Sequence, residues 1–436
     1  MSPRLRGAWL TVVLCLASAA LTEAQSPPEA PQESPGDDDF RARALPTPQL
    51  RWGDWFTIEL ITKLQTDIIR VDPDLDGNAD DFDWRRRRFG VRGQVLGWLS
   101  YEVEREFRDK ADPWRDVYAN AKVNDLLEVR AGLFKVPFSL DNLTGSTSHD
   151  FVYKSVAART ISPGRDPGLQ VWGRSDGRRF TYFVGMFRGA DEETTHDAVL
   201  DDDKAGESLG RTFSARVTVQ PLDAVDRLPR ALRNLEFGVN GGSSTVPEGL
   251  NGVRGRSVFG FEFFAPVYVK GHRVRAGADA ALFAGPTSVK AEWIGAWDER
   301  RDQGLGDETL PDVFSRGWYT SGTWLLTGER KEDSDVRPRR PLFQGGFGAV
   351  EAAVRFERLS FGSSSTNGEP AFANPRAAHL LGNRDDILTM GVTWYLNRWF
   401  KLQTNAIHET LEDPERTPLT GVRSYWSYVS RLQFAF

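Results

Sequence analysis

Cysteine is almost absent from this chain of 436 residues, and its single copy, Cys15, lies in the first apolar stretch. A chain exported without that stretch therefore has no disulfide to stabilise it. The five histidines lack the spacing of metal ligands, which argues against a zinc site. No uncharged apolar run of about 20 residues lies beyond position 25, which excludes helical membrane spans. Nucleophile elbows, phosphate-binding glycine-rich loops and dinucleotide fingerprints are missing as well.

Positive charge is in slight deficit, with 55 Lys and Arg against 61 Asp and Glu and a formal net charge of −6. That balance argues against a nucleic-acid-binding protein, which needs a basic surface. Only ten of the basic residues are lysines, so arginine supplies most of the positive charge. Glycine (41), tryptophan (14) and phenylalanine (27) are plentiful, a composition typical of β-rich chains with many turns.

Residues 1–24 have the pattern of a cleaved secretory signal peptide. Arg4 and Arg6 give a basic start, a short apolar stretch follows, and Thr22 and Ala24 place small residues at the two positions that a signal peptidase reads. The apolar stretch is too short for a membrane anchor, and no stop-transfer pattern follows it. We therefore expect export and removal of this segment.

The rest of the chain divides at residue 51. Residues 25–50 are rich in proline and include the acidic run Asp37–Asp39, so we expect a flexible periplasmic tail. From 51 to 436, apolar and polar residues alternate in short stretches separated by Gly, Asp, Asn and Pro, which predicts β-strands. Alternating apolar positions include Val117, Ala119, Ala121 and Val123, then Leu127, Val129, Ala131 and Leu133, and later Leu388, Met390, Val392 and Trp394.

Two architectures give this alternation, a soluble sandwich and a transmembrane barrel. Many apolar faces carry only Ala, Gly and Val, which would fill a sandwich core poorly. Trp and Tyr cluster at strand ends, as at Trp394 and Trp399, where a barrel meets the two membrane interfaces. The chain ends with Tyr428, Leu432, Phe434 and Phe436 on one face, an ending that resembles the assembly signal of bacterial outer-membrane barrels. We therefore predict an all-β fold, a transmembrane antiparallel β-barrel of about sixteen strands over residues 51–436.

Sixteen candidate strands lie between residues 54 and 436, and an even number leaves both termini in the periplasm. Tight turns such as 123–126 and 284–287 fall on one side, and long polar segments such as 189–210 fall on the other. Segment 328–346 is an exception, because it is long and lies on the side of the tight turns. A count of eighteen strands is therefore the alternative.

Charged residues on two neighbouring predicted strands indicate a hydrated lumen. Arg86, Arg88 and Arg92 share one strand face, and each would cost about 2–4 kcal/mol if that face met lipid at the bilayer midplane. They must therefore face water beside glutamates of the next strand. Those glutamates are Glu102, Glu104 and Glu106. One interpretation is cross-strand ion pairing that stiffens the wall. The other is a field of separated charge that selects ions.

A lumen with more arginines than carboxylates favours anions, because guanidinium groups bind phosphate and carboxylate bidentately. Residues 135–167 form a long non-alternating stretch, and in a wide barrel such a loop is expected to fold inward as a constriction. The positions predicted to line the anion pathway and its constriction are Arg86, Arg88, Arg92, Arg130, Lys154 and Arg165.

Several ordered motifs resemble the phosphate-selective porin O and P family of Gram-negative outer membranes. They are Trp84-Arg85-Arg86-Arg87-Arg88-Phe89-Gly90-Val91, Gly132-Leu133-Phe134-Lys135-Val136-Pro137-Phe138-Ser139-Leu140, Pro163-Gly164-Arg165-Asp166-Pro167-Gly168, Gly317-Trp318-Tyr319, Leu326-Thr327-Gly328-Glu329, Trp394-Tyr395-Leu396-Asn397 and Gln433-Phe434-Ala435-Phe436. The resemblance implies a sixteen-strand trimeric porin whose third loop folds inward, with an arginine ladder that leads small anions to a constriction. By this resemblance Arg165 matches the arginine of the inward loop. His149 and Lys154 stand where that loop usually has a lysine and an acid–arginine pair.

A second constellation has the spacing of a twelve-residue calcium loop. Its oxygen ligands would be Asp72, Asp74, Asp76, Asn78, Asp80 and Asp83, with Gly77 at the sharp turn. The expected glutamate at the last position is replaced by Asp83, and no flanking helices are predicted. The alternative is a solvated acidic loop on the outside of the membrane.

The sequence thus predicts an outer-membrane porin, a passive diffusion channel that prefers anions, with phosphate or polyphosphate among the solutes, and not an enzyme. The alternatives are a weakly selective general porin, a barrel enzyme, or a structural or adhesin barrel. The expected partners are small anions such as phosphate, outer-membrane lipid and lipopolysaccharide, the barrel-assembly machinery and two further copies of the chain. Apart from calcium in the acidic loop, no cofactor is expected.

Overall fold

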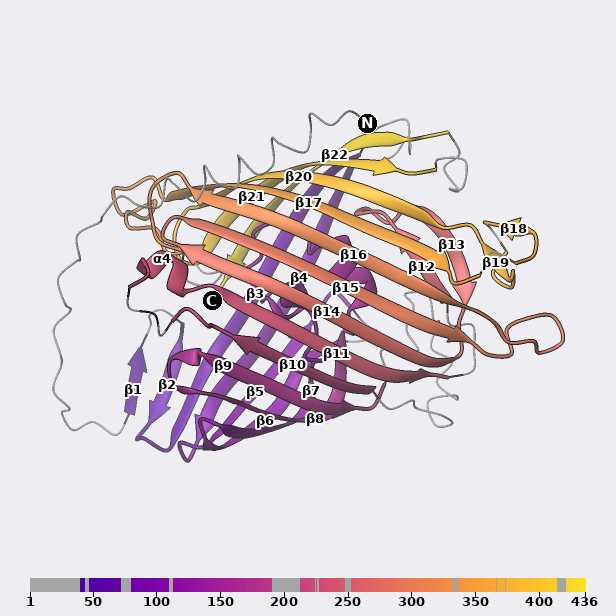
Figure 1. Cartoon of the computed structure of the whole chain (residues 1–436). Coiled ribbons are helices and arrows are strands. Elements are labelled where there is room, and N and C mark those ends of the chain that lie inside the picture. The colour runs from indigo at the N-terminus through magenta and orange to yellow at the C-terminus, as the bar shows by residue number, and fades with distance from the viewer. Residues whose placement is uncertain are drawn as a thin grey trace.

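Sixteen antiparallel strands close into a barrel in the computed structural model of the chain, shown in Figure 1. The structure describes residues 40–43, 47–71, 80–109, 113–189, 212–223, 225, 227–247, 252–331, 336–365, 367–372, 374–413 and 421–436. The barrel strands are β3 (Phe56–Val71), β4 (Asp80–Val95), β5 (Leu99–Glu106), β6 (Trp114–Asn124), β7 (Leu127–Lys135), β8 (Arg165–Arg174), β9 (Phe180–Phe187), β10 (Thr212–Val219), β11 (Glu236–Val246), β14 (Gly271–Ala284), β15 (Thr287–Arg300), β16 (Leu310–Leu325), β17 (Ala349–Ser363), β20 (Asn383–Tyr395), β21 (Phe400–Leu411) and β22 (Ser424–Ala435).

Each barrel strand pairs with its neighbours in sequence, and the last strand closes the ring on the first. In that closure Ser427 of β22 lies opposite Val71 of β3, and Ala435 lies opposite Lys63. The prediction of sixteen barrel strands is confirmed. Residues 326–348 connect β16 to β17 without contributing a strand to the ring among their described positions, so the alternative of eighteen barrel strands is not needed.

A short hairpin extends the sheet beyond the ring. It consists of β1 (Phe40–Arg43) and β2 (Gln49–Trp52), and β2 pairs with the first residues of β3. Part of the segment 25–50 that was predicted to be a flexible tail is therefore strand. The reason is that β22 pairs with β3 only from Lys63 onward, which leaves the preceding edge of β3 open for β2.

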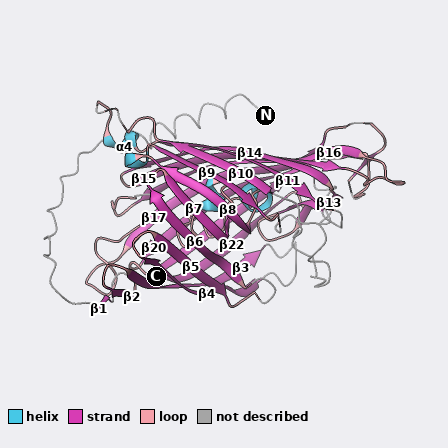
Figure 2. Ribbon diagram, turned by 90° about the horizontal axis from the view of Figure 1, so that it is seen from below, coloured by secondary structure: helices cyan, strands magenta, loops and turns pink. Residues whose placement is uncertain are grey.

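The two ends of the barrel differ (Figures 1 and 2). One end, here called the turn end, carries β1, β2, the short helix α4 (Arg230–Arg233) and tight connections such as residues 285–286. The other, here called the loop end, carries two small two-stranded pairs, the first antiparallel and the second parallel. These are β12 (Gly252–Arg256) with β13 (Glu262–Tyr268), and β18 (Pro370–Ala371) with β19 (His379–Leu380). No helix in the described part of the chain is long and apolar enough to cross a membrane.

Side chains alternate across the barrel wall as the sequence predicted. Ile68, Val392 and Val239 are 62%, 52% and 58% exposed on the outside of the ring. Arg431 and Glu104 belong to the opposite face and are buried inside it. Because an outward arginine would meet hydrocarbon, this arrangement is the one that a barrel in a membrane requires.

The segment between β7 and β8 folds into the barrel, as predicted for residues 135–167. This inward loop, residues 136–164, contains helices α2 (Leu140–Leu143) and α3 (Val156–Ile161). Ser139 and Ser155 cap the two helices, since each side-chain oxygen accepts a hydrogen bond from a backbone N–H in the first turn. The caps satisfy backbone donors that would otherwise be unpaired inside the lumen.

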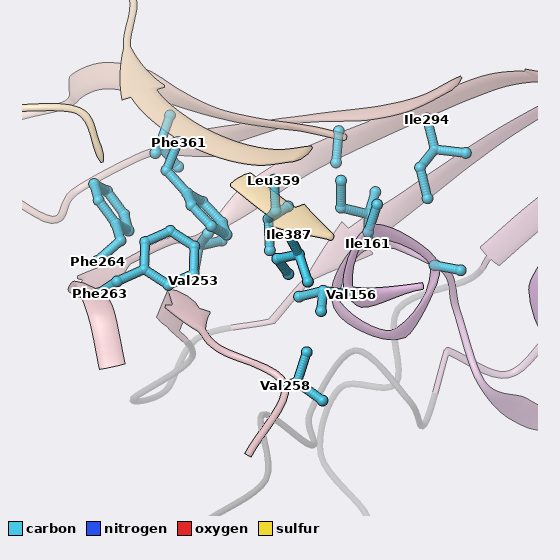
Figure 3. Close-up of a cluster of buried hydrophobic side chains, with 14 of the residues drawn as sticks. Val156, Ile161, Val253, Val258, Phe263, Phe264, Ile294, Leu359, Phe361 and Ile387 are labelled. Carbon is cyan, nitrogen blue, oxygen red and sulfur yellow. The ribbon is translucent and has the colours of Figure 1, made fainter. Parts of the chain in front are cut away.

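Apolar packing fixes the inward loop against one side of the lumen. Val156 and Ile161 of α3 pack in one buried cluster with Leu359 of β17 and Ile387 of β20 (Figure 3). The β12–β13 region adds further side chains to the cluster from the loop end. They include Val253, Val258, Phe263 and Phe264. The inward loop thus has apolar contacts with β17 and β20, although the inner faces of β14 to β22 also carry buried charged side chains such as Asp279 and Glu357.

Candidate functional site: the cationic patch of the lumen

The inward loop begins where β7 leaves the barrel wall. The β6–β7 ladder ends with Val117 opposite Leu133, whereas the β7–β8 ladder continues to Lys135 opposite Arg165. The Arg165 guanidinium reaches back to the Asp116 carboxylate on β6, with an Nη2–Oδ2 distance of 2.8 Å. Strict alternation would turn Lys135 and Arg165 toward lipid. Because the last residues of β7 and the first residues of β8 have left the wall together, both side chains remain inside the barrel.

Side chains of the wall satisfy the backbone of the inward loop. Asn405 of β21 accepts from Val152 N at 2.7 Å, and Arg431 of β22 donates to Val152 O at 2.5 Å. Glu357 of β17 accepts from Val156 N at 2.6 Å. A buried loop without such partners would leave costly unpaired backbone groups. Polar residues deep in the lumen thus hold the loop in one position.

Five basic residues gather where the inward loop faces β4. This cationic patch consists of Arg86, Arg88, Lys135, Lys154 and Arg165. The charges of Arg165, Arg86 and Arg88 all act on Lys154, and those of Lys154, Arg165 and Arg88 act on Lys135. The five residues come from three elements of the wall and from the inward loop.

Carboxylates compensate only part of the cationic patch. Arg88 donates to Glu106 at 2.9 Å and lies 3.4 Å from a Glu104 oxygen, and Arg165 is paired with Asp116. Glu104 is shared, because Lys63 also donates to it. In these two cases the interpretation of cross-strand ion pairing applies.

The other three members of the patch meet neutral oxygens. Arg86 Nη1 donates to the Gln65 side-chain oxygen. Lys135 Nζ donates to the backbone carbonyls of Asn142 and Thr144 at 2.6 and 2.8 Å, and Lys154 Nζ donates to the Asn142 side-chain oxygen at 2.6 Å. A carbonyl orients a cation without cancelling its charge, so the charges of these three residues are opposed only by carboxylates that are not their hydrogen-bond partners, such as Asp141 near Lys154.

Burial lowers the pKa of two titratable groups of the inward loop. Burial is the main cause that lowers the pKa of Lys154; Asp141 opposes this effect, and Arg165 adds to it. Burial also lowers the pKa of His149, although its Asp141 partner opposes the shift. His149 is therefore neutral at pH 7 and adds no charge to the lumen.

The structure brings together four of the six predicted pathway residues, namely Arg86, Arg88, Lys154 and Arg165. Arg92 lies apart at the turn end, exposed and paired with Glu59 at 2.8 Å. Arg130 lies beside the patch, and its guanidinium carbon is 4.5 Å from the centroid of the Tyr118 ring and 5.7 Å from that of Trp172.

Sequence reasoning missed Lys135. It belongs to the predicted inward stretch 135–167 and to the quoted Gly132–Leu140 motif, but it was not among the predicted pathway residues. The signal that marks it is its position at the last residue before the inward loop, where a strand that leaves the wall no longer obeys alternation.

Other lumen arginines are structural. Arg216 of β10 forms a bidentate pair with Asp279 of β14, at 2.5 and 2.8 Å. Arg275 donates to Ile161 O at 2.8 Å and Arg355 donates to Tyr153 O at 3.1 Å, so both hold the inward loop. A count of lumen arginines therefore overstates the charge that a permeating ion meets.

The predicted calcium loop falls mostly outside the described residues, at Asp72, Asp74, Asp76 and Asn78. Asp80 and Asp83 belong to β4 instead of a loop. Arg108 lies 3.0 Å from the Asp83 carboxylate, and Arg85 lies 3.8 Å from it. Both arginines thus contact Asp83, the last of the expected calcium ligands. Calcium binding stays a prediction, and equal heats of calcium titration before and after Asp74→Ala would contradict it.

Comparisons with known proteins agree with the barrel fold. Residues 58–436 match the family model described as phosphate-selective porin O and P. The chain is 24% identical over 356 residues to an uncharacterized protein of Caulobacter vibrioides. The matched region covers 78% of this chain and 68% of that protein. Its fold is similar to that of OmpT of Vibrio cholerae, with a TM-score of 0.54 and 11% identity over 88% of this chain and 99% of that one.

The outer-membrane channel DcaP of Acinetobacter baumannii also has a similar fold, with a TM-score of 0.53 and 11% identity over 88% of this chain and 98% of that one. At such low identity these two likenesses show the fold alone. The family match covers nearly all of the barrel, which places the protein among the channels of the outer membrane. The chain belongs to the phosphate-selective porin O and P family.

Proposed function

We propose that this porin is a passive channel that prefers small anions, including phosphate. The observation that supports the proposal most directly is the set of partners in the cationic patch. Arg86, Lys135 and Lys154 donate to neutral oxygens, so their charges are available to an ion in the lumen. Guanidinium and ammonium groups offer the N–H donors that replace the water shed by an oxyanion.

The carboxylates beside the patch have a positioning role in this proposal. Glu104 and Glu106 hold the Arg88 guanidinium, and Asp116 holds that of Arg165. Donors fixed in advance need no reorganisation when an anion arrives. The same carboxylates weaken the field, and for this reason a weakly selective general porin is the second candidate.

Substitutions that leave no carboxylate without a partner give the cleanest test. Arg86→Gln and Lys154→Gln each remove one charge whose partner is a neutral oxygen. We expect each to lower the anion/cation permeability ratio by about two- to fivefold, because a unit charge about 4 Å from an ion in water contributes about 1 kcal/mol. Reversal potentials in planar bilayers measure this ratio.

The matched control is Arg51→Gln, which removes an exposed arginine on β2 at the turn end. Its ratio should equal that of the wild type. Unchanged ratios in both patch variants would contradict the role of the cationic patch. A wild-type protein that conducts no current at all would instead favour a barrel enzyme or an adhesin.

We also infer that the chain works as a homotrimer after removal of residues 1–24. A solved form of OmpT of Vibrio cholerae, which shares this fold, is described as a trimer. Chemical cross-linking of the purified protein should give products of up to three chains and none larger. N-terminal sequencing should begin at residue 25. A monomer, or a first residue elsewhere, would contradict the respective proposal.

A further inference from the structure

The long connection at the turn end, which the sequence marked as an exception, begins with a tightly bound strap, residues Leu326–Lys331. Leu326 N donates to Val350 O at 2.8 Å, and Lys331 N donates to Gly285 O at 2.9 Å. The strap turns at Gly328, whose φ of +81° favours glycine. The first residues of β17 and the turn between β14 and β15 thus fix its path.

The strap places one lysine side chain inside the barrel. Lys331 is 2% exposed, although it belongs to a connection at the membrane surface. Its ammonium group lies 2.5 Å from a Glu351 oxygen of β17 and 3.0 Å from the Thr323 hydroxyl of β16. Glu351 is itself held by the Tyr395 hydroxyl, which donates to its other oxygen at 2.7 Å.

The third partner of this ammonium group belongs to the inward loop. Lys331 Nζ lies 2.6 Å from Asp150 Oδ1, and Lys290 of β15 binds the other oxygen of the same carboxylate at 2.9 Å. Burial disfavours the charged carboxylate, but the charges of Lys331 and Lys290 outweigh it and lower the pKa of Asp150. The aspartate is therefore an anion clamped between the wall and the strap.

We propose that Lys331 is a positioning residue, which pins the inward loop from the periplasmic face of the channel through Asp150. Asp150 lies four residues before Lys154, the member of the cationic patch that the loop carries. The pin limits movement of this part of the loop across the lumen. In this way a surface connection on one side of the membrane sets the geometry of the constriction.

The proposal does not depend on anion preference, because any current through the channel reports loop movement. Loss of the pin should increase fluctuations of the open-channel current severalfold at constant voltage. It should also lower the anion/cation ratio if Lys154 selects anions. Current fluctuations alone test the pin, so failure of the proposed anion selectivity remains a separate result.

Three variants isolate the contact between strap and loop. Lys331→Met would leave Glu351 buried without its cation, so it is combined with Glu351→Gln. Glu351→Gln alone is the matched control, since it keeps the Lys331–Asp150 pair. Asp150→Asn breaks that pair from the other side. Folding of every variant is checked by its resistance to SDS before heating.

We expect Lys331→Met/Glu351→Gln to increase current fluctuations relative to Glu351→Gln, and Asp150→Asn to increase them at least as much, because it also weakens the Lys290 contact. Combining all three substitutions should add little, because one contact is broken once. The proposal is overturned if current fluctuations of Lys331→Met/Glu351→Gln are no larger than those of Glu351→Gln. It is equally overturned if only Asp150→Asn becomes noisy, since Lys290 would then act alone. A surface control, Lys122→Met, removes an exposed lysine from the same end and should leave the current unchanged.

Discussion

Arg88 and Lys154 both carry a positive charge into the lumen, but their partners give these charges different roles. Arg88 is held by two glutamates, whereas Lys154 donates to the amide oxygen of Asn142. The two glutamates largely compensate the charge of Arg88, whose main role is to hold an N–H donor in place. The hydrogen-bond partner of Lys154 is neutral and does not cancel the charge of its ammonium group. For the proposed anion channel we therefore expect selectivity to depend on the partner of each basic residue more than on the number of basic residues.

The lowered pKa of Lys154 predicts a pH dependence. A lysine whose pKa is depressed is fully charged below that pKa and loses its charge as the pH rises through it. The anion preference should therefore begin to fall at a lower pH than the one at which an ordinary lysine loses its charge. Of the neighbouring charges, Asp141 raises the pKa of Lys154 and Arg165 lowers it. Reversal potentials measured from neutral to alkaline pH show this decrease.

The control for the pH dependence is Lys154→Gln, which has no ammonium group at this position. The difference between wild type and variant isolates Lys154 from Lys135, which also titrates. Parallel pH profiles of the two proteins would contradict the assignment.

At the site, sequence reasoning succeeded where alternation holds and failed where the chain leaves the wall. Arg86 and Arg88 were predicted because three arginines on one strand face cannot meet lipid. The outlying position of Arg92 was not predicted, since alternation fixes the face of a strand but not the depth in the pore. Lys135 was missed because β7 leaves the wall just before it.

At the scale of elements, the inward loop is stable because the wall supplies partners for its backbone. The strongest single anchor is Arg431 of β22, which forms a bidentate pair with Asp67 of β3 at 2.6 Å and also donates to Val152 O. All three partners lie in the barrel interior. This residue joins the two strands that close the ring to the loop that narrows it.

Arg431→Met should therefore destabilise the protein strongly. It leaves the Asp67 carboxylate buried with only the Tyr153 hydroxyl, which lies 3.1 Å away. Breaking one side of a buried ion pair costs about 3–5 kcal/mol. Thermal unfolding followed by circular dichroism should show a clear decrease of the midpoint temperature.

The control is Arg398→Met, which removes an exposed arginine whose guanidinium lies over the ring of Trp399. Its midpoint should stay close to that of the wild type. Equal midpoints for the two variants would show that Arg431 does not anchor the loop.

Elements with a regular period were predictable, and short irregular ones were not. Two-residue alternation identified the barrel strands, although β3 and β4 extend further toward the loop end than expected. The pairs β1–β2 and β12–β13 were missed, because strands of four to seven residues give too little alternation to recognise. Their partners, an open edge of β3 and the interior of the barrel, exist only in the folded molecule.

At the scale of the whole molecule, inward-pointing apolar residues of β17, β20 and β21 hold the inward loop among buried charged groups of the same strands. Leu359, Ile387 and Ile407 point into the barrel and pack against the inward loop. Sequence alone cannot distinguish such inward apolar residues from lipid-facing ones. The proposed anion pathway runs past the cationic patch, whose members come from β4, β7, β8 and the inward loop.

The most direct test of this account is the reversal potential of the wild-type channel in a planar bilayer under a potassium chloride gradient, repeated with potassium phosphate. The account predicts a potential of the sign set by the anion in both salts, because Arg86, Lys135 and Lys154 of the cationic patch have neutral oxygens as hydrogen-bond partners. A potential near zero, or one of the sign set by potassium, would contradict it.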